Sequence, residues 1–248
     1  MFKNIDWRGE LAGLFDLFLP PACPLCGIEL PAGRPPGFCP ACLAGIHPVV
    51  SPSCPRCCLP YPTEDGTDHL CGTCLVSSPP FAWIRAAGVY EESLRRAVQR
   101  FKYEGAVQLD RQLGRLLAAA VREDLRQFRP HLLVAVPLHA TRLRERTYNQ
   151  SLLLARRLAR HRRIPVAADL LVRTRPTPPQ QGLSARERRQ NLRGAFALRK
   201  ALAGERVVLV DDVVTTGATV SECSRALLAA GAGQVAVAVL GRARRQPR

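Results

Sequence analysis

Two adjacent aspartates, followed by a turn of small residues, form the segment of this chain with the clearest chemistry. The segment begins at Val207 with a run of β-branched and apolar residues, which is typical of a parallel strand buried on both faces. Asp211 and Asp212 follow at the predicted carboxyl end of this strand, where open α/β sheets bind ligands and where two carboxylates can accept hydrogen bonds from the neighbouring hydroxyls of a ribose. The turn lies at the start of a predicted helix, so its backbone N–H groups suit a phosphate. Its residues are Thr215, Thr216, Gly217, Ala218 and Thr219. Together these features predict a site for a phosphorylated ribose.

A second candidate anion site follows another predicted strand, at residues 132–136. The loop after this strand carries Arg142, Arg144 and Arg146 ahead of a helix. Arginine donates paired hydrogen bonds to phosphate oxygens, so the loop is predicted to stabilise a departing pyrophosphate. A solvated arginine-rich face is the alternative. The position directly after a buried strand favours the binding interpretation, because such loops line the ligand crevice.

Eight cysteines are spaced as four Cys-x2-Cys knuckles, a pattern that predicts metal ligation. With 12 residues between the first two knuckles and 13 between the last two, they fit two closed, tetrahedral zinc sites that are structural rather than catalytic. Disulfides are the alternative, and the lack of a recognisable secretory signal favours zinc. The predicted ligands are Cys23, Cys26, Cys39, Cys42, Cys54, Cys57, Cys71 and Cys74.

The spacing leaves the pairing of the knuckles open. Sequential pairing gives two zinc ribbons in tandem, whereas a cross-braced arrangement joins the first knuckle to the third. Cys58 is predicted to be a spare thiol, although it could replace its neighbour Cys57 as a ligand. His47 and His69 lie nearby but are not needed, because each site already has four thiolates.

The elements that must position these residues divide the chain into three predicted parts. Residues 1–22 contain an amphipathic helix, residues 23–78 form a double zinc-ribbon module, and residues 79–248 form an α/β domain. Nine of the ten cysteines precede residue 75, and this shift in composition marks the second boundary.

Strand-like and helix-like segments alternate in the last part, which predicts a mostly parallel sheet. The predicted strands are residues 81–90, 132–136, a short strand near Leu170, residues 207–210 and residues 234–243. The predicted helices are residues 91–103, 107–128, 149–162 and 218–230, the last of them closed by Gly231.

The segment from Arg173 to Phe196 is rich in proline and arginine and is predicted to be a lid or binding loop, with a disordered surface loop as the alternative. Ser184 and Glu187 form a possible capping box that opens a short basic helix. Its arginines are candidates for contacts to a nucleic-acid strand. They are Arg188, Arg189 and Arg193.

The net charge of +16 predicts a protein that seeks anions. Only three of the 36 lysines and arginines are lysines, so the arginine excess fits phosphate contacts, and it fits a biased genome composition equally well. No segment approaches the length of a membrane span, and the amphipathic N-terminus is expected to pack on the protein itself rather than on a membrane. A cytoplasmic location is expected.

The residues from Val207 to Thr219 resemble the 13-residue phosphoribosyl-pyrophosphate (PRPP) motif of the type I phosphoribosyltransferases, in which the acidic pair holds the ribose hydroxyls and the turn holds the 5′-phosphate. Over nearly the whole chain, the order of segments resembles the ComF family of competence proteins. The segments are the cysteine knuckles, FKYEG, VPLHATRLRERTYNQ, PPQQGLSARERRQNLRGAF and the PRPP motif.

This resemblance implies a fold of the type I phosphoribosyltransferase kind behind the zinc ribbons. It also implies that Asn149 and Gln150 belong with the arginine loop. Thr147 and Tyr148 stand where a Gly-Phe pair is common in the family, a departure that is not expected to disturb phosphate binding.

The function implied is the binding of PRPP or a related ribose phosphate with Mg²⁺, in a protein of DNA uptake or natural transformation. Its partners would be single-stranded DNA or proteins of DNA uptake and recombination. The alternative is an active nucleobase phosphoribosyltransferase of nucleotide salvage, in which Asp211 and Asp212 orient the sugar as catalytic residues. Because fold alone does not establish transfer, both hypotheses stand at this point.

Overall fold

The computed structural model of the 248-residue chain describes residues 21–31, 37–63, 65–175 and 185–245. The predicted N-terminal helix and Ser184 of the predicted capping box lie outside these residues. Within them, no helix is both long enough and apolar enough to cross a bilayer.

A parallel sheet of four strands forms the centre of the molecule, in the order β1-β6-β5-β2. The strands are β1 (Ile84–Val89), β2 (Leu132–Ala135), β5 (Arg206–Val214) and β6 (Gln234–Arg242). The two central strands, β5 and β6, consist almost wholly of buried residues, as expected for parallel strands covered on both faces. The predicted mostly parallel sheet is thereby confirmed.

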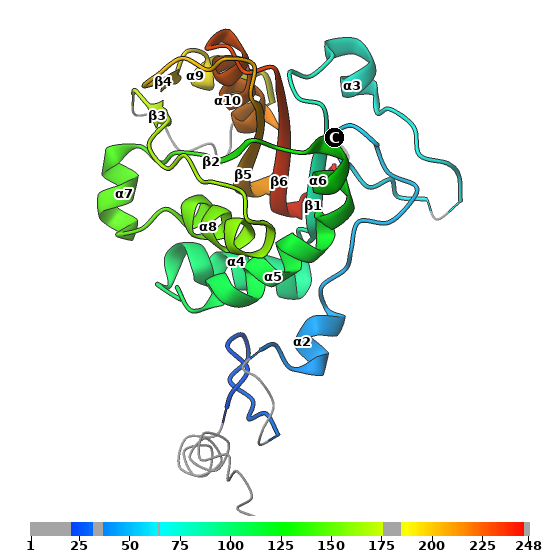
Figure 1. Cartoon of the computed structure of the whole chain (residues 1–248). Helices are drawn as coiled ribbons and strands as arrows, with labels where there is room; N and C mark the ends of the chain where they lie inside the picture. Colours follow the sequence, from blue (N-terminus) through cyan, green and yellow to red (C-terminus); the bar gives the residue numbers. More distant parts are fainter. Residues whose placement is uncertain (1–20, 32–36, 64, 176–184, 246–248) are drawn as a thin grey trace, which may run out of the picture.

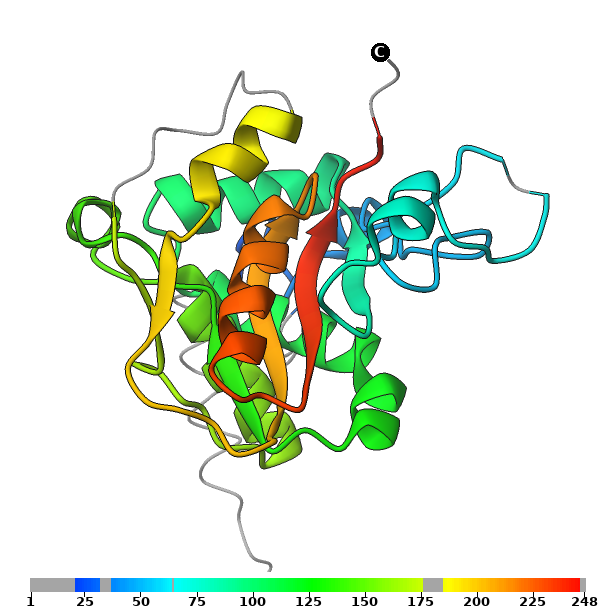
Figure 2. The ribbon, with the colours of Figure 1, turned by 90° about the horizontal axis from the view of Figure 1, so that it is seen from above.

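Helices cover both faces of this sheet (Figure 1). One face carries α4 (Glu92–Tyr103), α5 (Leu109–Ala120) and α8 (Gln150–Arg162), and the other carries α10 (Ala218–Ala229). Figure 2 shows α10 lying along the central strands.

Successive side chains of a strand point to opposite faces, so the valine-rich strands supply both cores. Val208 and Val210 pack in the core with α4, α5 and α8, whereas Val207 and Leu209 pack in the core with α10.

Two predicted elements differ from the structure. The predicted helix over residues 107–128 is divided at Val121 into α5 and α6 (Arg122–Phe128). Val121 is itself fully buried, so the break lets the chain turn while keeping this side chain in the core.

The strand near Leu170 does not join the parallel sheet. It is β3 (Leu171–Arg173), which pairs antiparallel with β4 (Phe196–Leu198) in a separate two-stranded sheet. This hairpin-like pair flanks α10, beside α9 (Ala185–Leu192). At three residues each, these strands are too short for sequence patterns to reveal their partners.

The cysteine-rich segment packs against both faces of the sheet. The first cysteine cluster (Cys23, Cys26, Cys39 and Cys42) contributes to the core that holds α4, and the second cysteine cluster (Cys54, Cys57, Cys71 and Cys74) contributes to the core that holds α10. In the second knuckle of each cluster, a short helix begins directly after the first cysteine. These helices are α2 (Pro40–Ala44), after Cys39, and α3 (Gly72–Ser77), after Cys71. Figure 1 shows these two helices far apart in the molecule.

Candidate functional site

Strand β5 continues through both aspartates and ends only at Val214. The expectation that Asp211 and Asp212 stand at the strand end is therefore corrected. They lie inside its last four residues, and their exposed fractions are only 9% and 4%. On one side, β6 continues the pairing past the apolar run to Val214, which keeps this backbone extended, whereas the pairing with β2 ends at Val210.

Three side chains from two helices hold the aspartates in place. Lys102 Nζ, from the last turn of α4, lies 2.7 Å from Asp212 Oδ1. From the first turn of α8, Gln150 Nε2 donates to Asp212 Oδ2 at 2.7 Å and Ser151 Oγ donates to Asp211 Oδ1 at 2.9 Å. Oδ2 of Asp211 accepts no hydrogen bond from the described residues, so this oxygen is available to a ligand.

The two carboxyls and the lysine shift one another's ionisation. Burial, and then the nearby charge of Asp212, raise the pKa of Asp211 to about 7. Burial on its own would lower the pKa of Lys102, but the charge and hydrogen bond of Asp212, together with the charge of Asp211, outweigh burial and the pKa of Lys102 is raised. The lysine therefore stays charged and compensates Asp212, while Asp211 titrates near neutral pH.

The threonine turn (residues 215–219) follows β5 and leads into α10. Thr215 and Thr216 are exposed, and Gly217, at φ 81°, is the residue before the first helical position. That left-handed conformation favours glycine and lets the backbone reverse into the helix. The exposed turn thus places the amino end of α10 beside the buried aspartates.

Arg142, Arg144 and Arg146 lie on a short helix, α7 (Ala140–Arg146), where a loop was predicted. Because β2 and β5 are neighbours in the sheet, α7 follows the strand end next to the acidic pair. Within the described residues, no hydrogen bond or ion pair joins these arginines to the aspartates or the threonine turn. Arg146 instead stacks over the ring of Tyr103, 4.8 Å from its centroid.

Thr147 and Tyr148, which stand where a Gly-Phe pair is common, each have a defined place in the fold. Thr147 ends α7 in the left-handed conformation, at φ 63°, which glycine adopts more easily. The hydroxyl of Tyr148 donates to the carbonyl of Phe101, and the two rings pack together. Asn149 caps α8 by accepting from the N–H of Leu152.

The predicted basic helix exists as α9, with Arg188 and Arg189 within it. Arg193 is exposed but lies one residue beyond the helix, which is a correction to its predicted position. Fully buried Leu192 and a hydrogen bond from Gly194 N–H to Glu222 on α10 fix this end of the segment beside α10.

Sequence reasoning gave no role to Lys102, Ser151 or Arg242. Lys102 stands in the FKYEG segment and is one of only three lysines among 36 basic residues, so its rarity was a usable signal. Ser151 and Arg242 resemble ordinary helix and strand residues in the sequence. Arg242 is nevertheless 95% buried, with only 5% of its surface exposed, and its guanidinium contacts both the end of β5 and the second cysteine cluster.

The cysteines form the sequential grouping, in which each cluster combines two successive knuckles. The ligand atoms of each cluster all lie within 4.8 Å of one another, and the Cys26–Cys39 and Cys57–Cys71 sulfur pairs are 3.6 Å apart. Zn–S bonds of about 2.3 Å at tetrahedral angles place sulfurs about 3.8 Å apart, so both clusters fit a structural zinc ion.

The remaining thiols and imidazoles stay outside the clusters. All ten cysteines are free thiols rather than disulfides. Burial raises the pKa of Cys58, which suits an unreactive spare thiol. His47 pairs with Glu92 and His69 stacks on Tyr61, so neither imidazole is committed to a cysteine cluster.

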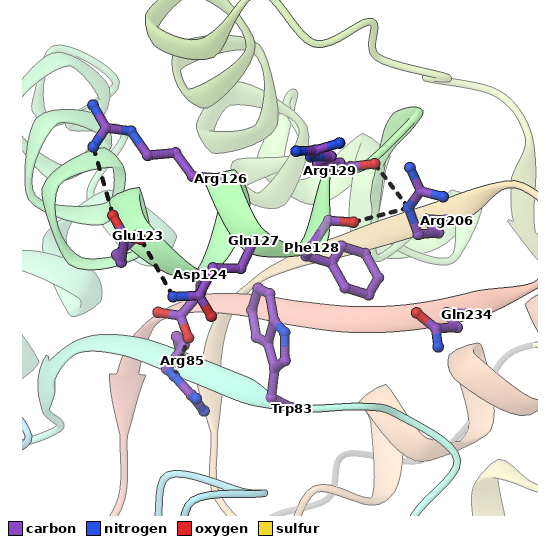
Figure 3. A pocket seen from close by; sticks show the side chains of 10 residues that line it. All are labelled: Trp83, Arg85, Glu123, Asp124, Arg126, Gln127, Phe128, Arg129, Arg206 and Gln234. Atoms are coloured by element: carbon purple, nitrogen blue, oxygen red, sulfur yellow. Dashed lines mark hydrogen bonds and ion pairs between the residues drawn. The ribbon is translucent and has the colours of Figure 1, made fainter.

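A separate hollow of about 860 Å³ lies at the amino ends of the strands, opposite the acidic pair (Figure 3). Trp83 precedes β1, and Arg206 and Gln234 begin β5 and β6. Arg206 donates to the carbonyls of Phe128 and Arg129, so its charge is engaged within the fold. This end of a parallel sheet is not where such folds bind ligands, and the hollow is distinct from the candidate site.

Comparison with known proteins agrees with this architecture. A family model described as double zinc ribbon domain matches residues 14–75, and one described as phosphoribosyl transferase domain matches residues 149–248. Fold and sequence therefore define a protein with a phosphoribosyltransferase-type domain and a double zinc ribbon.

Three relatives span most of the chain. Competence protein F of Haemophilus influenzae is 36% identical over 221 residues, which cover 83% of this chain and 96% of that protein. DNA utilization protein YhgH of Escherichia coli K12 is 36% identical over 225 residues, covering 89% and 96% of the two chains. Competence protein ComFC of Streptococcus pneumoniae is 24% identical over 203 residues, covering 80% and 84%. The chain belongs to the ComF family of competence and DNA utilization proteins.

Proposed function

We propose that this protein binds PRPP or a related ribose phosphate at the carboxyl end of β5 and uses this site in the uptake or utilization of DNA. The observation that carries the proposal is the position of the buried aspartates near the end of β5, two residues before an exposed turn at a helix amino end. Carboxylate oxygens suit the ribose hydroxyls, and the turn's N–H groups suit the 5′-phosphate.

Each part of the ligand has a counterpart in the site. Asp211 Oδ2 would accept a ribose hydroxyl, since Oδ1 is already occupied by Ser151. Lys102 and Gln150 hold the carboxyl group of Asp212 in position rather than free to rotate. The ligand's phosphate oxygens would carry Mg²⁺ with few ligands from the protein.

Thermal unfolding with PRPP and Mg²⁺ tests this proposal, because a ligand that binds only the folded state raises the melting temperature. Asp211→Asn keeps the side-chain volume but removes the anionic acceptor, so the stabilisation by PRPP should fall. Asp169→Asn is the matched control, since Asp169 is exposed and lies elsewhere. Equal stabilisation of all three proteins would place the ligand at another site.

The enzymatic alternative is favoured by one observation, the position of α7. Its arginines follow the strand next to the acidic pair, where they could meet a departing pyrophosphate. Pyrophosphate release from PRPP in the presence of a panel of nucleobases tests for transfer. PRPP binding without such release supports ligand binding only.

The DNA-handling part of the proposal is supported by the net charge of +16 and by the relatives' names, competence protein and DNA utilization protein. No motif for reading bases is present, so binding of single strands should tolerate any sequence and weaken steeply as salt rises. Replacing Arg188, Arg189 and Arg193 with alanine should flatten this salt dependence and leave PRPP binding largely intact.

A control variant carries the same loss of charge at exposed arginines of α5 and α6, namely Arg111, Arg115 and Arg122. If both triple variants lose DNA binding equally, the contact is a general charge effect. If the α9 variant loses PRPP and keeps DNA, that segment covers the ribose-phosphate site, and the enzymatic alternative gains.

A further inference from the structure

Arg242 is a buried cation that joins two regions far apart in the sequence. It ends β6, where it pairs with Val214 of β5 on one side and Val89 of β1 on the other. Only 5% of its surface is exposed. The guanidinium therefore lies at the carboxyl edge of the sheet, at the start of the threonine turn.

One edge of the guanidinium holds that turn. Nη1 donates to the carbonyls of Val214 and Thr215, at 3.0 and 2.5 Å, and to Ala243 O at 3.2 Å. Val214 ends β5 and Thr215 begins the turn. These bonds fix the direction in which the chain leaves the strand, and so the direction of the N–H groups that follow.

The other edge faces the second cysteine cluster. Nε donates to Cys57 O at 3.0 Å, and Nη2 lies 4.0 Å from Cys57 Sγ. No carboxylate is among the hydrogen-bond partners of Arg242 in the described part of the chain. A buried charge is costly unless an opposite charge compensates it, and four thiolates around one Zn²⁺ carry a net charge of −2.

The first cysteine cluster offers a contrast that serves as a control. The arginine beside a sulfur of this cluster is Arg96 of α4, whose Nη2 lies 3.7 Å from Cys42 Sγ. Arg96 is exposed and makes no contact with the threonine turn among the described residues. Both clusters thus have an arginine beside a sulfur, but only Arg242 extends from its cluster to the candidate site.

We infer that Arg242 is a positioning residue that ties the threonine turn to the metal of the second cysteine cluster. Ribose phosphate binding then depends on that metal and not on the metal of the first cluster, a consequence that rests on the proposed function. Loss of the second metal frees the knuckle that carries Cys57, so the guanidinium loses its partner there and its hold on the carbonyls of Val214 and Thr215 weakens.

Amide hydrogen exchange of the zinc-loaded full chain tests the coupling without any ligand. Arg242→Gln should speed the exchange of amides 215–219, and Arg96→Gln should leave it unchanged. PRPP with Mg²⁺ should bind Arg242→Gln about ten-fold or more weakly, as expected when hydrogen bonds from a charged group are lost. Unchanged exchange in Arg242→Gln, or equal acceleration in both variants, would overturn the inference.

If Arg242→Gln does not fold, stepwise removal of the metals from the wild-type protein with a chelator tests the same inference. Under the inference, amides 215–219 lose protection together with those of the second cluster's first knuckle, Cys54 to Cys57. If amides 215–219 lose protection together with the knuckle from Cys23 to Cys26, or lose no protection at all, the inference is contradicted. If the wild type fails to bind PRPP, the proposed function is wrong, while the exchange results still decide whether Arg242 couples the turn to the cluster.

Discussion

The two cysteine clusters share a ligand pattern but differ in how deeply they join the fold. All four cysteines of the second cluster are buried, whereas Cys26 of the first is exposed. The first cluster meets α4 through Arg100, which donates to the carbonyls of Pro24 and Leu25. The second contacts β1 and β6 directly, through Arg85 and Arg242.

Two similar four-cysteine clusters therefore support different parts of one domain. The first cluster packs on the outside of a helix that supplies Lys102 to the acidic pair. The second cluster packs within the core that underlies the threonine turn. Four experiments, in order of decreasing expected effect, test how far the difference goes.

Removing one ligand from each cluster should give the largest effect. Cys23→Ser and Cys54→Ser should each reduce zinc content from about two ions to about one per chain. Cys23 and Cys54 are both buried, but all four cysteines of the second cluster are buried whereas Cys26 of the first is exposed. Replacing Cys54 should therefore lower the free energy of unfolding by more than about 4 kcal/mol, and replacing Cys23 by less. Metal analysis and urea unfolding measure both. Equal losses of stability would remove the distinction between the clusters.

Breaking the ion pair between Lys102 and Asp212 tests the helix on which the first cluster packs. Asp212→Asn leaves the largely buried lysine without its ion-pair partner, and should lower the free energy of unfolding by about 3 kcal/mol. Adding Lys102→Met removes the uncompensated charge, so the double variant should lose less than the two single variants together. Strictly additive losses would show that the pair is not coupled.

The pH dependence of PRPP binding tests whether Asp211 binds the ligand as a carboxylate. Its pKa rises from an ordinary value of 3.8 to about 7 in the folded protein, so folding favours the protonated form. The stability from this group is full below about pH 4 and is lost as the pH rises through 7. PRPP binding should change in the opposite direction and strengthen toward pH 8, because the carboxylate is the acceptor.

The phosphates of PRPP themselves titrate near pH 6, so the effect of Asp211 on binding must be separated from that of the ligand. Asp211→Asn should retain only the pH dependence of the ligand's phosphates, as measured by isothermal titration calorimetry from pH 5 to 8. An identical profile in the wild type would mean that Asp211 does not titrate in this range.

Two glycines should give the smallest effect. Gly217, in the threonine turn, and Gly27, in the first cluster's first knuckle, have φ angles of 81° and 76°, and an added Cβ would meet no atom closer than 4.0 Å at either. Alanine at either position should therefore cost about 1 kcal/mol through backbone strain alone. Only Gly217→Ala should also weaken PRPP binding, and equal weakening by Gly27→Ala would connect the first cluster to the site.

The features that depend on local pattern could be predicted from the amino-acid sequence. Runs such as Val207 to Val210 predicted a buried parallel strand because only a strand covered on both faces is apolar at every position. The spacing of the cysteines predicted two four-sulfur clusters because a knuckle presents two sulfurs from one tight turn. The acidic pair and the turn were likewise visible, since all their residues are contiguous.

The tertiary structure alone decided which distant residues meet these features. Lys102 reaches Asp212 across 110 positions, and Arg242 reaches Cys57 across 185, through helices and strands whose packing no local pattern specifies. It also decided that the aspartates are buried and partnered instead of solvated, because β6 continues its pairing with β5 past the apolar run and α4 and α8 supply the partners. Charges that are desolvated by folding must find partners wherever the fold brings them, and those partners follow from three-dimensional packing rather than from spacing along the chain.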